Sequence, residues 1–222
     1  MKDAVIQKQL SDAIVRGDSQ TAETKAKFIA QYAEDPTEAL DDLYDAFRTA
    51  ESLHALGEYD EEQFAASCSA ARVSLAILRG SLVPKQTRFT ARLCIGPVSG
   101  GADVMSAIMA AMLSAAGHEV VDLSKSTTPR ELLRNAEQSN AELLIVSMNE
   151  QTASIANEFV NEYESGGFRN KYGVIAFARG SEIPETASSP FILVAHEPLE
   201  LLSKTTEFMI RKQGSDRRRR AE

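Results

Sequence analysis

Residue types that build metal sites, disulfide frameworks and membrane anchors are scarce in this sequence. Its 222 residues include three histidines, two cysteines and no tryptophan. Two cysteines are too few for a disulfide framework or a cysteine zinc site, so a reducing cytoplasm is the expected compartment. No apolar run reaches the roughly 18 residues of a membrane-spanning helix. The first residues turn polar at Gln7, so no secretory signal is expected.

Basic residues are also fewer than acidic ones. The chain has 24 lysines and arginines against 32 aspartates and glutamates, and the net charge of −8 argues against a nucleic-acid-binding body. Residues 1–84 carry −7, residues 85–212 carry −3 and residues 213–222 carry +2. The basic segment contains four arginines, Arg217, Arg218, Arg219 and Arg220. They form either a solvated tail or a contact for an acidic partner or nucleic acid.

Residues 1–84 have the composition and periodicity of a helical bundle. They contain three glycines and are rich in Ala, Leu, Glu and Lys, which favour helices. Apolar residues recur at helical spacing in four segments, with breaks at Gly17, Pro36 and Gly57 and an end at Gly80. Four helices with short connectors predict a compact bundle.

After a short linker at residues 84–90, apolar runs alternate with helical segments. Five strands are expected, at residues 91–95, 118–123, 142–147, 172–178 and 191–195. This rhythm predicts an α/β domain over residues 85–212, and five strands suit a flavodoxin-like parallel sheet of order 2-1-3-4-5. The last helix is expected from Pro198 to about Arg211, followed by a basic flexible tail at residues 213–222.

An open α/β sheet binds ligands beyond the carboxyl ends of its strands, at the switch point between strands 1 and 3. Two polar segments fall there, at residues 96–103 and 147–152. The candidate binding residues are Ser99, Gly100, Gly101, Asp103, Ser147 and Thr152. The glycine pair allows a ligand to approach the backbone closely, and a tight turn is the alternative interpretation. Neither a dinucleotide fingerprint nor a P-loop motif is present.

Several segments match one known pattern in order along the chain. They are Ile14-Val15-Arg16-Gly17-Asp18, Gly57-Glu58-Tyr59 with Phe64, Gly96-Pro97-Val98-Ser99-Gly100, residues 112–123, and Val146-Ser147 with Thr152. From about residue 5 to about residue 210, the sequence resembles the two-domain corrinoid proteins of methyltransferase systems. The resemblance implies a helical cap on a cobalamin-binding domain, with a corrinoid or another small ligand between them and a protein partner.

The sequence departs from this family at the cobalt site. The family motif D-x-H-x-x-G supplies a histidine to cobalt and an aspartate that orients it. Here Gly101 takes the aspartate position, Asp103 the histidine position and Ser106 the glycine position. A carboxylate is a hard ligand and a poor replacement for imidazole on cobalt. The three histidines, His54, His118 and His196, are expected to be surface or packing residues.

A second departure follows strand 4. The family has two glycines there, which leave room for the nucleotide tail of cobalamin, whereas this chain has Phe177, Ala178 and Arg179. The phenylalanine ring would fill that slot, and Arg179 would place a cation near the pocket mouth. The glycine at the end of strand 2 is replaced by Ser124. We therefore do not expect cobalamin to bind with a histidine on its cobalt and its nucleotide tail inserted into the domain. Binding of a corrinoid in another mode, or of another ligand, is still consistent with the sequence.

Three functions are consistent with these observations. The first is a non-catalytic sensory, regulatory or partner-binding module. The second is a corrinoid methyl carrier that lacks the usual axial histidine. The third is an enzyme that uses the switch-point loop, with Glu150 as base. A homodimer is a further candidate assembly, and Cys68 and Cys94 are interpreted as buried structural thiols.

Overall fold

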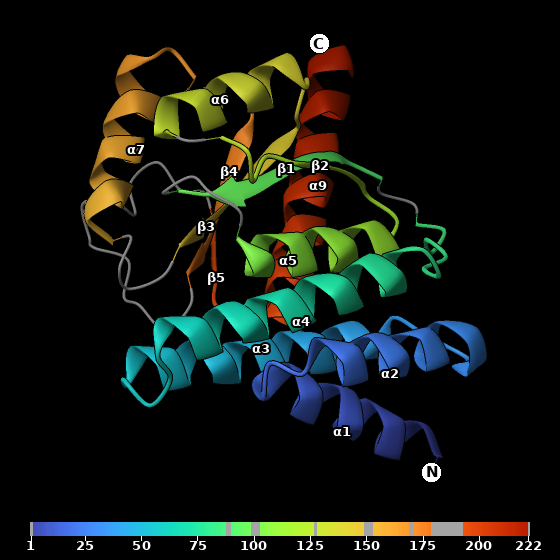
Figure 1. Cartoon of the computed structure of the whole chain (residues 1–222). Coiled ribbons are helices and arrows are strands. Elements are labelled where there is room, and N and C mark those ends of the chain that lie inside the picture. Colours follow the sequence, from blue (N-terminus) through green and yellow to red (C-terminus); the bar gives the residue numbers. More distant parts are fainter. Residues whose placement is uncertain are drawn as a thin grey trace. The chain divides into compact units, whose positions relative to one another are not determined.

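A computed structural model describes residues 2–87, 90–98, 103–126, 128–148, 153–168, 171–178 and 193–221 (Figure 1). The chain divides into two compact units, residues 1–84 and residues 85–222. None of the described helices is both long and apolar enough to cross a membrane.

The first unit is an all-helical bundle, as the periodicity predicts. Its helices are α1 (Lys2–Val15), α2 (Ser19–Tyr32), α3 (Glu38–Ala55) and α4 (Glu61–Arg79). Helix α1 packs on the other three, and α4 packs on α2 and α3. The interior is formed by the apolar stripes of these helices, including the fully buried Leu10, Ile14, Leu43, Phe47 and Leu78.

Side chains from α4 and the turn before it close the end of α1. The carbonyl oxygen of Val15, left without a helical partner, accepts the hydroxyls of Tyr59 (2.8 Å) and Ser67 (3.1 Å). Gly17 then turns the chain with a φ of +71°, and a Cβ there would lie 2.6 Å from that of Ala66. The bundle therefore depends on the close approach of Gly17 to α4 as well as on its apolar core.

The second unit is an α/β domain, and its strand order confirms the predicted one. Its elements are β1 (Arg92–Pro97), α5 (Val104–Ala115), β2 (Glu119–Asp122), α6 (Pro129–Gln138), β3 (Leu143–Met148), α7 (Ala153–Ser165), β4 (Gly173–Ala178), β5 (Leu193–Ala195) and α9 (Pro198–Ala221). All described strands are parallel, in the order β2-β1-β3-β4-β5. The parallel sheet follows from the alternation of strands and helices.

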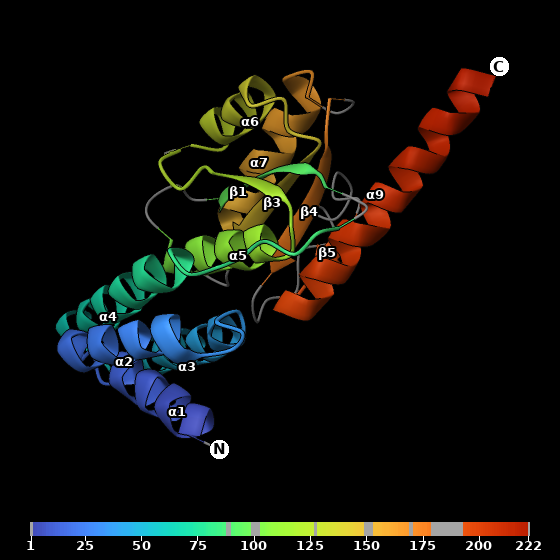
Figure 2. The ribbon, with the colours of Figure 1, turned by 90° about the vertical axis from the view of Figure 1, so that its right-hand side faces the viewer.

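The helices cover opposite faces of this sheet (Figure 2). A Cβ on Gly96 of β1 would meet Leu132 of α6, whereas one on Gly173 of β4 would meet Phe208 of α9. Helices α6 and α7 therefore pack on one face, and α5 and α9 pack on the other. Because successive side chains of a strand point to opposite faces, every second residue of a strand contacts the same pair of helices.

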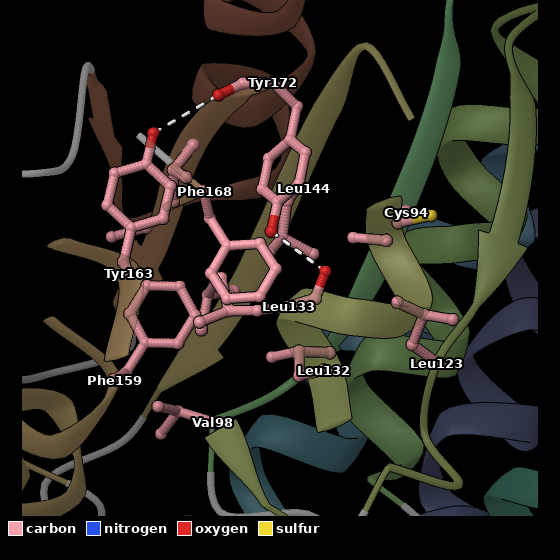
Figure 3. Close-up of a cluster of buried hydrophobic side chains, with 14 of the residues drawn as sticks. Cys94, Val98, Leu123, Leu132, Leu133, Leu144, Phe159, Tyr163, Phe168 and Tyr172 are labelled. Carbon is pink, nitrogen blue, oxygen red and sulfur yellow. Dashed lines mark hydrogen bonds between the residues drawn. The ribbon is translucent and has the colours of Figure 1, made fainter. Parts of the chain in front are cut away.

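The α6–α7 face carries an aromatic cluster (Figure 3). The hydroxyl of Tyr172 donates to the carbonyl of Leu133 at 3.0 Å, and the hydroxyl of Tyr163 donates to the carbonyl of Tyr172 at 3.3 Å. Burial raises the pKa of the Tyr172 phenol. Both phenols are thus satisfied inside the core, which makes their role structural.

The last helix is longer than predicted. The sequence places its end near Arg211, but α9 continues to Ala221 through the residues interpreted as a flexible tail. Arginine is a good helix former, so the four consecutive arginines extend the helix instead of ending it. The helix tolerates Gly214 within this stretch.

The chain enters the second unit through a tight contact. The N–H of Lys85 donates to the carbonyl of Ala115 at 2.8 Å. Gly117 has a φ of +95°, and a Cβ there would lie 2.2 Å from the carbonyl oxygen of Lys85. Gly167 also has a positive φ, of +76°, but its Cβ would meet nothing within 4 Å.

These two glycines give a matched test of the contact. Gly117→Ala should lower the free energy of unfolding by about 2–4 kcal/mol, because backbone strain and a main-chain clash combine. Gly167→Ala should lower it by about 1–2 kcal/mol, from the strain alone. Urea unfolding followed by circular dichroism measures both, and equal losses would contradict the contact at Lys85.

Candidate functional site

The carboxyl ends of the parallel strands meet at one edge of the sheet, where the sequence predicts the site. There β1 ends at Pro97 and β3 at Met148, next to each other in the sheet. Of the predicted binding residues, the structure describes Asp103 and Ser147. The others, Ser99, Gly100, Gly101, Thr152 and Arg179, lie outside the described residues, as does Glu150.

Asp103 is the N-cap of α5. Its Oδ1 accepts the N–H of Met105 at 3.1 Å, and its Oδ2 accepts the N–H of Ser106 at 3.1 Å. These two amides have no partner within the helix, so the carboxylate satisfies them. Its negative charge also faces the positive end of the helix dipole.

The same carboxylate accepts two buried hydroxyls. The Oγ of Ser106 donates to Oδ2 at 2.6 Å, and the Oγ of Ser147 donates to Oδ2 at 3.1 Å. Ser106 is 0% exposed and Ser147 is 2% exposed. The carboxylate therefore joins the first turn of α5 to the end of β3.

The main chain ties the same region together. Ser147 stands beside Pro97 of β1 and Phe177 of β4 in the sheet register. Its carbonyl accepts the N–H of Val98 at 3.0 Å. Both the side chain and the main chain of Ser147 are therefore engaged in holding β1, β3 and α5 together.

Phe177 fills the neighbouring part of this face. Phe177 is four residues after Gly173 on β4, so both point to the side of the sheet that packs on α9. The Phe177 side chain is 0% exposed. The structure therefore places the ring inside the protein near the end of β4, as the sequence predicts for this position.

His196 lies at the same edge, directly after β5. Its Nδ1 is 2.9 Å from the carbonyl oxygen of Ala178, the last residue of β4. Because a carbonyl oxygen only accepts, Nδ1 is the donor in this contact. In the sheet order, β5 and the following His196 are three strands from β1. The ring, however, contacts the end of β4, which is one strand nearer to β1.

A second set of contacts fixes the backbone of His196. Its N–H donates to Oε2 of Glu200 at 2.8 Å. Lys204 donates to the other carboxylate oxygen of Glu200 and to the carbonyl of Val194. The hydrogen bonds from Lys204 and from the His196 N–H lower the pKa of Glu200, so this carboxylate is ionised at neutral pH.

The other two histidines are structural. The His54 ring stacks on Phe64 at 4.4 Å between centroids, and its Nδ1 is 3.2 Å from the carbonyl of Tyr59. His118 lies at the amino end of the sheet, where its Nδ1 is 3.4 Å from the N–H of Ala91. Burial lowers the pKa of His118, which favours its neutral form.

The thiol of Cys94 is buried and unreactive. Cys94 is 0% exposed in β1, and burial raises the pKa of its thiol to about 11, so it is protonated at neutral pH. Cys68 on α4, predicted to be buried, is only partly buried and is not in a disulfide. Among the described residues, no three His, Cys, Asp or Glu side chains gather closely enough to hold a metal ion by themselves.

The sequence contains one local signal for the role of Asp103 as a helix cap. An aspartate directly before an apolar helical run is a typical N-cap, and Val104 begins such a run. The hydroxyl of Ser147 had no such local signal, because it meets Asp103 only through the sheet order.

Substitution of Asp103 tests this arrangement. Asp103→Ala should lower the free energy of unfolding by about 2–4 kcal/mol, because it removes a helix cap and leaves two buried hydroxyls without their acceptor. Asp103→Asn keeps an oxygen for the cap and should cost about 1 kcal/mol. Urea unfolding gives both values. In the Asp103→Ala background, Ser147→Ala should add little, and fully additive losses would show that the two side chains are not coupled.

Comparison with known proteins shows the fold. No family model matches the sequence, and no curated protein matches it. Among solved structures, the Methanosarcina barkeri monomethylamine corrinoid protein matches with a TM-score of 0.73 and 16% identity, over 93% of this chain and 100% of that one.

Two further structures are similar at lower TM-scores. A cobalamin-binding protein from Desulfitobacterium hafniense DCB-2 has a TM-score of 0.47 and 15% identity, over 91% of this chain and 98% of that one. The methanol:cobalamin methyltransferase complex MtaBC from Methanosarcina barkeri has a TM-score of 0.45 and 16% identity, over 92% and 80%. The likeness to the monomethylamine corrinoid protein confirms the predicted fold: this chain has the fold of a corrinoid protein over nearly its whole length.

Proposed function

We propose that this chain is a non-catalytic relative of the corrinoid methyl carriers, a module that senses a ligand or binds a partner. The fold supports the relationship, because one corrinoid protein matches 93% of the chain. The site supports the loss of the carrier function, because the residue that takes the place of the axial histidine has another role.

The observation that carries this proposal is the bonding of Asp103. Its two oxygens accept two helix amides and two buried hydroxyls. A carboxylate engaged in this way has a structural task, and carboxylates suit hard cations better than cobalt in a corrin. The residue at the histidine position therefore does not fit the role of axial ligand.

Phe177 supports the same conclusion for the nucleotide tail. In the family resemblance, two glycines leave a slot after strand 4, whereas here the β4 ring is fully buried. A side chain of this size occupies space that glycines leave open. The described residues thus do not fit a corrinoid held by a β1 histidine with its tail inserted beside β4.

A second candidate is a corrinoid methyl carrier with altered ligation. It is favoured by the fold likeness to the monomethylamine corrinoid protein, which covers the helical unit as well as the sheet. In this case the chain would still deliver methyl groups between partner enzymes, with a ligand other than a β1 histidine on the cobalt. The enzyme hypothesis rests on Glu150, outside the described residues, and stays a prediction.

Methyl transfer separates the two candidates. The full chain is mixed with hydroxocobalamin, passed through gel filtration and assayed with methanol or a methylamine and the corresponding methyltransferase. We expect no methyl transfer above that of free hydroxocobalamin, because no described residue at the β1 position can ligate cobalt in the carrier mode.

The colour of the filtered protein distinguishes the two forms of the proposal. Retained pink-red cobalamin without methyl transfer supports a sensory module, and colourless protein without methyl transfer supports a partner-binding one. Methyl transfer well above the free cofactor would overturn the proposal and establish a carrier. Asp103→Asn serves as the control, since it should leave each result unchanged.

A further inference from the structure

The last helix changes character after Lys212. Before that point it packs on the sheet, because Leu201, Thr205 and Met209 recur every four residues and are at most 3% exposed. Residues 213–220 continue the helix with the sequence Gln-Gly-Ser-Asp-Arg-Arg-Arg-Arg, which contains no apolar residue. This segment, which we call the basic end of α9, therefore has nothing to bury in a core.

The basic end of α9 extends beyond the packed elements of its own domain (Figure 2). Helix α9 is anchored by its earlier turns, which pack on α5, β4 and β5. Lys212 then bonds to Glu142, directly before β3, so the basic end lies beyond the amino ends of the strands. Because the anchored turns supply the costly nucleus, the extension only has to propagate an existing helix.

The charges of α9 divide at the same place. Before the basic end, each cation is paired with a glutamate: Lys204 with Glu200, Arg211 with Glu207 and Lys212 with Glu142. The basic end has four arginines and one acidic residue, Asp216, so it carries an excess of three positive charges. This excess is opposite in sign to the net charge of the chain, and the local charge decides which partner a surface attracts.

The spacing of the arginines favours one kind of anionic partner. Consecutive positions on an α-helix differ by about 100°, so residues 217–220 are distributed around the whole helix axis. A flat acidic protein surface meets only one side of a docked helix. The major groove of B-form DNA has phosphates along both walls and is about 12 Å wide, which admits a helix about 10–12 Å across.

We propose that the basic end of α9 binds double-stranded DNA by entering its major groove. A guanidinium group forms paired hydrogen bonds with phosphate oxygens, so arginines around the helix axis suit contacts to both strands of the duplex. Contacts of this kind are independent of the base sequence. The inference goes beyond the proposed function and requires no corrinoid, because the basic end lies at the opposite edge of the sheet from the switch point.

Fluorescence anisotropy with a labelled DNA duplex of roughly 20 base pairs tests the proposal on the full chain. If each of the four arginines neutralises one phosphate, the logarithm of the association constant should fall against the logarithm of salt concentration with a slope of about −3 to −4. Between about 50 and 200 mM salt, the affinity should therefore drop about 100-fold. A single strand of the same length should bind more weakly, because it has no groove.

Two variants separate the charge from the helix. Replacing all four arginines (Arg217→Ala, Arg218→Ala, Arg219→Ala and Arg220→Ala) should weaken duplex binding more than about 100-fold and remove the salt dependence. Ser215→Pro keeps every charge but ends the helix before the arginines, because proline lacks an N–H and clashes with the preceding turn. It should weaken binding about tenfold, since the arginines are no longer pre-organised. Circular dichroism should show that both variants remain folded, because both changes lie beyond the packed turns.

Three results would overturn the proposal. A full chain that does not bind the duplex at about 50 mM salt would show that the basic end is only solvated. A Ser215→Pro variant that binds as tightly as the full chain would show a cationic tail instead of a helix in a groove. Displacement of the duplex by polyglutamate at a lower charge concentration than unlabelled duplex requires would indicate an acidic protein partner. None of these results bears on methyl transfer or cobalamin retention, which the hydroxocobalamin assay measures independently.

Discussion

The sheet domain depends on one carboxylate that is shared between a helix and a strand. Asp103 neutralises the amino end of α5 and accepts the hydroxyl of Ser147 at the end of β3. In many open α/β sheets this point attracts an anionic ligand, because helix amides and glycine-rich turns face it. Here the anion is part of the chain. A side chain of the protein itself therefore stabilises the helix end and the strand end at the switch point.

The sequence predicts the features that depend on neighbouring residues in the chain, and it does not predict contacts between residues far apart. The four helices, the five parallel strands and their order arise from periodicity and local breaks, and the structure confirms them. The prediction that the last helix ends near Arg211 was wrong, because α9 continues to Ala221. The cluster of like charges suggested a tail, whereas arginine is a good helix former. Long-range polar contacts were not predictable, because Asp103 and Ser147 are 44 residues apart and meet only once the sheet is ordered.

The candidate site shows the same division. The burial of Phe177 could be foreseen from its residue type alone. The orientation of His196 could not, because it depends on the side-chain rotamer and on the register between β4 and β5. Counting strands places this histidine far from the switch point, while the ring itself leans against the neighbouring strand. A distance between strands is therefore a poor guide to the reach of a side chain at their ends.

The contact that closes the end of α1 has a consequence for synthesis of the chain. The carbonyl of Val15 accepts hydroxyls from Tyr59 and Ser67, which are 44 and 52 residues later. At about 5–20 residues per second, the ribosome supplies these partners several seconds after α1 has been made. During that interval the end of α1 lacks these two hydroxyls, although α2 and α3 can already pack on its apolar stripe. The last turn of α1 is therefore completed only when α4 leaves the ribosome.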